Sequence, residues 1–356
     1  MLTAMRLATT VVAAASATTI VMGGVAYADP PRGVTPRAND VVGVGSDTTQ
    51  FVVDAFAKAY NTQKPAPANK LYSFDAVKPN TSPPVAGDLI KTKAGCATIA
   101  RPNGSSAGIA ALQASLAAGN GCIDFARSSR PASSTGTENN LVFVPFARDG
   151  VTWAAVPSNH TPKTLTPAQL ASIYTCSVTN WHQINSSLPS NPIHPFLPQT
   201  GSGTRSFFES AIGIQDTSVG SCVNQSVEEN NGKALAGDLN ALVPYSIARW
   251  IAQTPKAQGG RGAEPDIRGG VTLRKINGSA PTVKNAKTGQ ITLRAAFVPT
   301  FLRLVYNVLG KTSSGTFAAK YLRIFGTAAQ HGFICQHQTI VSNFGFGKIG
   351  TQCGAH

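Results

Sequence analysis

The stretch 199–210 constrains this chain more than any other. It reads Gln-Thr-Gly-Ser-Gly-Thr-Arg-Ser-Phe-Phe-Glu-Ser, a glycine-rich turn that leads into a predicted helix over 205–212. A helix N-terminus carries free N–H groups and a partial positive charge, so it attracts an anion. The hydroxyls of Ser202 and Thr204 and the guanidinium of Arg205 would complete a small oxyanion site. The alternative is a capped helix that binds nothing.

Three further turns rich in serine and threonine share this character. They occupy residues 46–49, 104–106 and 128–130. The first two lead into predicted helices over 51–60 and 109–116, and the third ends a short predicted strand. In open α/β sheets, ligands sit beyond the carboxyl ends of the strands. The sequence therefore predicts an α/β fold whose turns gather around one ligand.

The segment Gly104-Ser-Ser-Ala-Gly108 also matches the G-x-S-x-G pattern of a nucleophile elbow, with Ser106 as the nucleophile. Such an elbow follows a buried strand directly, whereas Arg101-Pro-Asn precedes this one. No downstream histidine has a local context that marks it as a catalytic partner. We therefore predict a protein that is not an enzyme, with a serine hydrolase as a minor alternative.

The chain contains six cysteines, and none of them has C-x-x-C spacing. An even number in an exported chain favours disulfides, for which 15 pairings exist. Sequential pairing closes three local loops and is our prediction: Cys96 with Cys122, Cys176 with Cys222, and Cys335 with Cys353. The six histidines are scattered, so we predict neither a metal site nor a cofactor.

Residues 1–28 have the pattern of a secretory signal peptide. One arginine, Arg6, precedes an apolar stretch over 7–25, and Ala-Tyr-Ala stands before Asp29. We expect cleavage after Ala28 and a secreted product in the cell wall or periplasmic space. Since no cysteine lies near the cleavage site, a lipid anchor is not expected.

The chain has 356 residues, with 30 lysines and arginines against 16 acidic residues, which gives a net charge of +14. This length suits two lobes. The charge indicates an anionic ligand or attraction to an acidic polymer. Because no basic run or interleaved aromatic stripe is present, we do not expect nucleic acid to be the partner.

Taken in order along the chain, these motifs resemble the PstS-like phosphate-binding proteins of ABC transporters, in the type II periplasmic-binding-protein superfamily. The segments that carry the resemblance are 43–49, 104–108, 124–128, 165–174, 179–181, 201–204 and 230–245. The resemblance implies two α/β lobes joined by two crossover strands, with a ligand cleft between them. The expected division is a signal peptide at 1–28, a flexible tether at 29–40, lobe 1 at 41–148 and 301–356, and lobe 2 at 149–300.

The family's contacts can be carried over position by position. The implied ligand contacts are Thr48 or Thr49, Ser105, Ser128 or Ser129, and Ser202, Gly203 and Thr204. The implied ligand is a small tetrahedral oxyanion, and the implied partner is an ABC permease that recognises the closed form. No chemistry on the ligand is needed.

Two departures from the family pattern concern the ligand. At the position of Ser129-Arg130, the family commonly has an aspartate. That aspartate accepts the proton of hydrogen phosphate. Asp47 is our candidate substitute, and Asp47→Asn is expected to weaken phosphate binding while sparing sulfate. The family's usual arginine before the 201–204 turn is also replaced, by Leu197-Pro198.

The missing positive charge would then come from Arg205, Arg127 or Arg130. We predict a phosphate-binding protein first, with sulfate or another oxyanion as the alternative ligand. The alternative class is a secreted basic protein that binds a surface or polyanion and has lost phosphate recognition.

Overall fold

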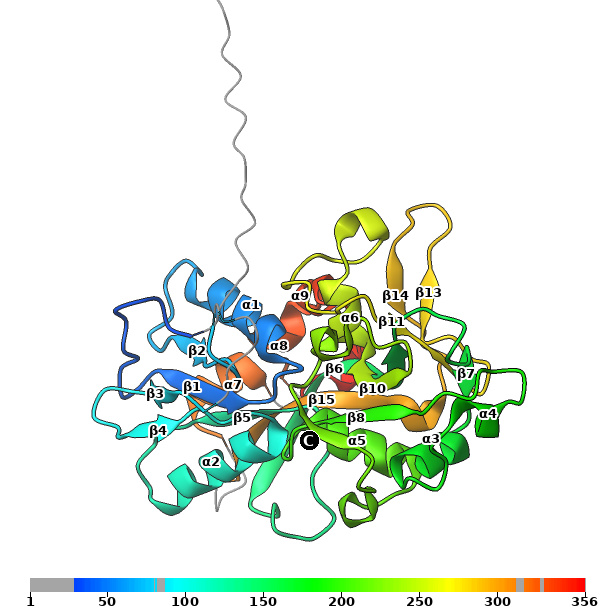
Figure 1. Ribbon diagram of the computed structural model, residues 1–356. Coiled ribbons are helices and arrows are strands. Elements are labelled where there is room, and N and C mark those ends of the chain that lie inside the picture. Colours follow the sequence, from blue (N-terminus) through cyan, green and yellow to red (C-terminus); the bar gives the residue numbers. More distant parts are fainter. Residues whose placement is uncertain (1–28, 80, 82–86, 312–316, 327–329, 356) are drawn as a thin grey trace, which may run out of the picture.

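The computed structural model describes residues 29–79, 81, 87–311, 317–326 and 330–355 (Figure 1). The signal peptide predicted at 1–28 lies outside these residues. Among the described residues, no helix combines the length and the apolar character that crossing a membrane requires.

One sheet of nine strands runs through the whole molecule. Its order is β2-β1-β5-β15-β6-β10-β8-β9, and β11 also pairs with β6. The strands are β1 Val41–Gly45, β2 Leu71–Ser73, β5 Phe125–Ser128, β6 Leu141–Ala155, β8 His194–Pro198, β9 Asn224–Val227, β10 Ala241–Ser246, β11 Thr272–Leu273 and β15 Leu302–Gly310.

Strands β6 and β15 are shared by two lobes. They pair with each other antiparallel over nearly the full length of β15. On one side β15 pairs with β5, which is parallel to β1. On the other side β6 pairs with β10, which is parallel to β8. The predicted α/β fold of two lobes joined by two crossover strands is thus confirmed, with lobe 1 at the left of Figure 1 and lobe 2 at the right.

Helices cover the sheet in each lobe (Figure 1). Those of lobe 1 are α1 Gln50–Asn61, α2 Ser105–Ala117, α7 Ala319–Phe325, α8 Phe333–Gln336 and α9 Gln338–Asn343. Those of lobe 2 are α3 Pro167–Tyr174, α4 Trp181–Ile184, α5 Gly203–Ile212 and α6 Ile247–Gln253. Short 3-10 turns are η1 Asp216–Ser218, η2 Gly232–Leu235, η3 Lys256–Gln258, η4 Pro299–Phe301 and η5 Gly350–Gln352.

Three small two-stranded sheets complete the fold. They pair β3 Leu89–Lys91 with β4 Thr98–Ala100, β7 Thr164–Leu165 with β12 Lys275–Ile276, and β13 Thr282–Lys284 with β14 Ile291–Leu293. The three disulfides follow the predicted sequential pairing: Cys96–Cys122, Cys176–Cys222 and Cys335–Cys353.

Each lobe buries its own apolar core. The helical spacing of Phe51, Val52 and Phe56 places one face of α1 against lobe 1, and all three are buried. In lobe 2 the large side chains of Trp153 and Trp181 are fully buried in a separate cluster. Because each lobe has its own apolar core, the contact between the lobes is made by polar turns such as those that carry Thr48 and Thr204.

The segment 29–40, for which the sequence predicts a tether, contacts lobe 1 near both of its ends. The Asp29 carboxylate lies 2.7 Å from the Arg101 guanidinium, and Asp40 is 1% exposed. The Asp40 carboxylate also accepts a hydrogen bond from the Lys70 backbone N–H at 2.9 Å. These polar contacts join the two ends of the segment to lobe 1, whereas residues 31–35 between them are exposed.

Candidate functional site

Hydroxyl groups from both lobes meet at the centre of the molecule. The Oγ1 atoms of Thr48 and Thr204 lie 3.1 Å apart, although 156 residues separate them in sequence. The Oγ atoms of Ser105 and Ser129 lie 3.2 Å apart, and the Ser129 backbone N–H donates to Ser105 Oγ at 3.0 Å. All four residues are at most 1% exposed. We call these four residues the hydroxyl cluster.

Glycines allow the lobes to approach so closely. A β-carbon on Gly203 would lie 3.0 Å from Ser105 Cβ and closer still to the hydroxyl oxygens of Ser105 and Ser129. Nearby, the Ser106 backbone N–H donates to the Gly201 carbonyl at 3.1 Å, from lobe 1 to lobe 2. Gly104 has a φ of 99° and would also meet Gly201 if it carried a side chain. Glycine at these positions is therefore a requirement of the contact between the lobes.

Three helices begin at the hydroxyl cluster. Helix α1 has Thr49 as its N-cap residue, α2 begins at Ser105, and α5 begins at Gly203. The Ser202 hydroxyl accepts from the Arg205 backbone N–H at 3.1 Å, so Ser202 caps α5. The buried Thr49 hydroxyl has no hydrogen-bond partner among the described atoms. Three helix N-termini around one point give a region of positive potential suited to an anion.

A buried ion pair places a positive charge at the site, although this charge was predicted to come from Arg205, Arg127 or Arg130. Arg303 on β15 donates to Thr204 Oγ1 at 2.9 Å and pairs with Asp149 on β6 at 2.8 Å. The two residues are register partners across the crossover strands, and their side chains are at most 1% exposed. Neither residue was predicted from the sequence, although Arg303 is the only charged residue in the run 297–308.

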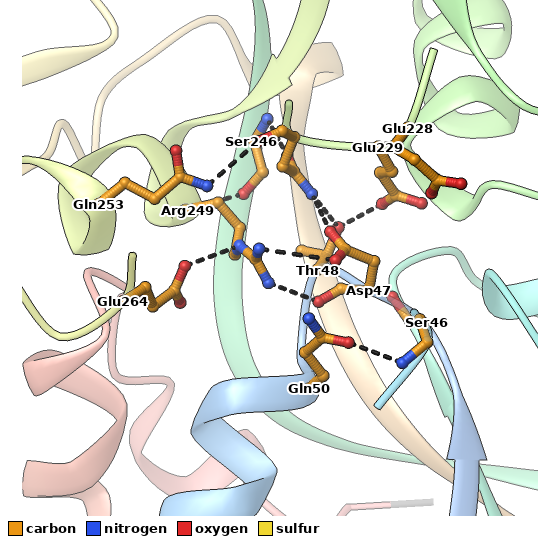
Figure 2. Close-up of polar contacts among 12 residues, drawn as sticks. Ser46, Asp47, Thr48, Gln50, Glu228, Glu229, Ser246, Arg249, Gln253 and Glu264 are labelled. Atoms are coloured by element: carbon orange, nitrogen blue, oxygen red, sulfur yellow. Dashed lines mark hydrogen bonds and ion pairs between the residues drawn. The ribbon is translucent and has the colours of Figure 1, made fainter. Parts of the chain in front are cut away.

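Asp47, the predicted proton acceptor, lies beside Thr48 of the hydroxyl cluster (Figure 2). Its carboxylate accepts from Asn230 Nδ2 at 2.9 Å and lies 3.5 Å from the Arg249 guanidinium. Arg249 also donates to the Asp47 carbonyl at 2.7 Å and pairs with Glu264 at 2.9 Å. Burial raises the pKa of Asp47, while Arg249 opposes the shift and Glu229 adds to it.

Glu229 of lobe 2 enters the hydroxyl cluster, a contact that was not predicted from the sequence. Its Oε1 accepts a hydrogen bond from Thr48, drawn in Figure 2, and another from Thr204 at 2.5 Å. The residue is 1% exposed. The neighbouring Glu228 accepts instead from Asn103 Nδ2 of lobe 1, at 3.0 and 3.1 Å. Burial raises the pKa of Glu228 to about 7.

Two of the predicted arginines point away from the hydroxyl cluster. Arg205 pairs with Glu209 at 2.9 Å and with Asp216 at 2.5 Å, on lobe 2. Arg130 pairs with Glu138 at 2.7 Å, on lobe 1. Both guanidiniums thus complete contacts within their own lobes.

Two further residues of lobe 1 also have internal partners. Arg127 is fully buried and donates to the Gly45 carbonyl at 2.9 Å and the Phe74 carbonyl at 2.7 Å, which fixes the turn after β1. The Ser128 hydroxyl donates to the Arg130 carbonyl at 2.7 Å, so Ser129 is the serine of this pair that reaches the hydroxyl cluster.

Ser106 does not sit on a nucleophile elbow. It lies in the first turn of α2, and the segment before it follows β4, a strand of a small separate sheet. Its Oγ accepts from Arg130 Nε at 3.1 Å. Within the part of the chain that the structure describes, no group of three or more histidine, cysteine or acidic side chains is placed to hold a metal ion.

Two lobes on shared crossover strands, with buried hydroxyls and helix N-termini between them, define the class of two-lobed solute-binding proteins. This chain belongs to the PBP superfamily, because residues 30–304 match the model of the PBP superfamily domain.

Comparison with known proteins confirms the predicted resemblance to PstS-like proteins. The chain is 33% identical over 125 residues to the phosphate-binding protein PstS of Staphylococcus haemolyticus, covering 31% of this chain and 39% of that protein. It is 35% identical over 103 residues to protein SphX of Synechococcus elongatus, covering 26% of this chain and 30% of that protein. These matches thus span well under half of either relative.

A solved structure shows the same fold over a longer range. It is described as a phosphate ABC transporter substrate-binding protein with bound phosphate, from Clostridium perfringens. The two chains are 20% identical with a TM-score of 0.57, over 87% of this chain and 100% of the other. At this identity the likeness establishes the fold alone.

Proposed function

We propose that this protein is an exported solute-binding protein that captures inorganic phosphate between its lobes and presents it to an ABC importer. The observation that carries the proposal is the meeting of Thr48, Ser105, Ser129 and Thr204, four buried hydroxyls from two lobes, at three helix N-termini. The names of the PstS relative and of the Clostridium structure support phosphate as the ligand.

The residues around the hydroxyl cluster suit a tetrahedral oxyanion. Hydroxyls of Ser105 and Ser129 would donate from lobe 1, and the backbone N–H groups at Gly203 and Thr204 would donate from lobe 2. Arg303 adds a guanidinium that Asp149 holds in place. Because the surroundings are buried, each hydrogen bond to the anion acts in a low dielectric and is strengthened.

The first test is calorimetric titration of the phosphate-stripped mature protein with phosphate and with sulfate. Ser105→Ala and Ser129→Ala should each weaken phosphate binding about 10- to 150-fold, the range for a hydrogen bond to a charged group. Ser172→Ala is the matched control, because that hydroxyl bonds to the Ala168 carbonyl within its own helix. Equal affinity in all four proteins would refute this assignment of the site.

Asp47→Asn tests the separate hypothesis that Asp47 accepts the proton of hydrogen phosphate. Loss of phosphate affinity with sulfate binding spared would support it. An unchanged phosphate affinity would leave Asp47 as a structural partner of Asn230 and Arg249.

The net charge of +14 favours one other candidate, a protein that adheres to an acidic surface or polyanion. Repeating the titration at two salt concentrations separates the two functions. Adhesion through surface charge weakens steeply with salt, whereas a buried oxyanion site is screened much less. Absence of heat with either anion, together with salt-sensitive adhesion to an anionic polymer, would favour this candidate.

A further inference from the structure

Glu229 occupies the position that an anionic oxygen would take in the hydroxyl cluster. Its Oε1 receives hydrogen bonds from Thr48 of lobe 1 and, at 2.5 Å, from Thr204 of lobe 2. Each hydroxyl has a single proton to give. While the carboxylate stays in place, neither threonine can donate to a second anion.

The backbone around Glu229 is fixed in this orientation. Its N–H donates to Gln199 Oε1 at 3.1 Å. The next residue, Asn230, has a φ of 59°, a left-handed conformation that a non-glycine residue adopts at a cost. The Asn230 side-chain amide donates to Asp47 at 2.9 Å and its Oδ1 accepts from the Ser246 backbone N–H at 3.0 Å. The Asn230 backbone carbonyl accepts from the Tyr245 hydroxyl at 2.5 Å. This strained and heavily bonded turn aims Glu229 at the cluster.

We propose that Glu229 is an internal ligand of this site: its carboxylate holds the two lobes together as an oxyanion would, and an entering phosphate must displace it. The proposal rests on the proposed function for the identity of the competing anion. Two negative groups between the same threonines would repel each other in a buried setting, so both cannot bind there together.

A cavity beside the hydroxyl cluster gives the displaced carboxylate a place to go. It has a volume of about 360 Å³, and Glu229 lines it together with the cations Lys78, Lys233 and Arg249 and the carboxylates of Asp47, Asp75, Glu228 and Asp266. The second carboxylate oxygen, Oε2, is buried and has no hydrogen-bond partner among the described atoms. A rotation of the side chain into this cavity would free both threonine hydroxyls and place the carboxylate in a lining of both charges, where Lys78, Lys233 and Arg249 supply the cations.

The test compares the wild-type chain with Glu229→Ala, which removes the carboxylate. Phosphate affinity by calorimetry should rise at least 10-fold. In small-angle scattering without anion, the variant should have a larger radius of gyration than the wild type, and phosphate should reduce it. Asp238→Ala is the control, because it removes the same charge from lobe 2 at a carboxylate that pairs with His194 of the same lobe at 2.7 Å. Its phosphate affinity should stay within threefold of wild type.

A fall in phosphate affinity in Glu229→Ala with sulfate unaffected would overturn the proposal and make Glu229 an acceptor for the ligand's proton. An unchanged radius of gyration would overturn it as well. If no protein binds phosphate, the proposed function fails, and the scattering of the anion-free proteins still decides the role of Glu229. Should Glu229→Ala not fold, Glu229→Gln keeps the shape, removes the charge and is expected to raise affinity by a smaller factor.

Discussion

Replacing Gly203 by alanine is expected to keep the lobes apart without damaging either one. The added β-carbon would stand 3.0 Å from Ser105 Cβ, an atom that side-chain rotation cannot move away. Ordinary carbon contacts need about 3.5–4.0 Å, so the lobes must separate by roughly 0.5–1 Å. Overpacking of this kind costs about 1–3 kcal/mol. Phosphate affinity should therefore fall about 5- to 150-fold.

Alanine forms helix better than glycine, by about 1 kcal/mol, so the stability of lobe 2 should not fall. Titration calorimetry measures the affinity, and thermal melting of the anion-free protein measures the stability. Gly347→Ala is the control, because the nearest atom to its β-carbon would be 3.4 Å away, an ordinary contact. Gly203→Ala with wild-type affinity would refute the view that the lobes must touch here for binding.

Three further predictions concern stability. Asp149→Asn leaves the buried Arg303 guanidinium without its counter-charge, so the free energy of unfolding in urea should fall by about 3–5 kcal/mol. The control is Asp266→Asn, which should cost about 0–1 kcal/mol because Asp266 pairs with Arg268 at a partly exposed position. Replacing Cys176 and Cys222 by serine opens a loop spanning 46 residues and should cost about 4 kcal/mol, measured in the same way. Burial raises the pKa of Glu264 to about 8, so the folded state holds this proton more tightly than the unfolded state. Stability should therefore decline as pH rises from 4.5, the ordinary pKa of this side chain, to about 8, by at most about 1.4 kcal/mol per pH unit for this group. Calorimetric melting should show a smaller decline in Glu264→Gln.

Much of the site was predictable because local patterns determine it. Glycine, serine and threonine at a strand–helix junction favour a helix start, and helices do begin at the turns 46–49, 104–106 and 201–205, although α2 and α5 start at Ser105 and Gly203, four and two residues earlier than predicted. The two lobes on crossover strands were predicted from the resemblance to the PstS-like family, which the order of these motifs carries. Sequential pairing of the cysteines followed from the short loops that it closes.

The charged partners were not predictable in the same way, because long-range packing selects them. Arg205 was assigned to the oxyanion, yet Glu209, one helical turn later, already offered it a local partner. Arg303 and Glu229 reach the hydroxyl cluster from segments far from it in sequence, and the contact of Glu229 with Thr48 spans 181 residues. No local pattern predicts such a contact. The one available indication was Arg303, because a lone charged residue in a buried strand requires a counter-charge.

The shared strands β6 and β15 also determine how the lobes can move. Two hydrogen-bonded strands form a narrow ribbon, which bends readily out of its plane but resists in-plane shear, because shear would break the ladder between them. A register shift between Val305 and Tyr306 marks where this ribbon is most easily flexed. We therefore expect the lobes to move chiefly by a rotation about this ribbon. Since Arg303 and Asp149 lie across from each other on it, such a rotation would displace these two charges less than the rest of the site.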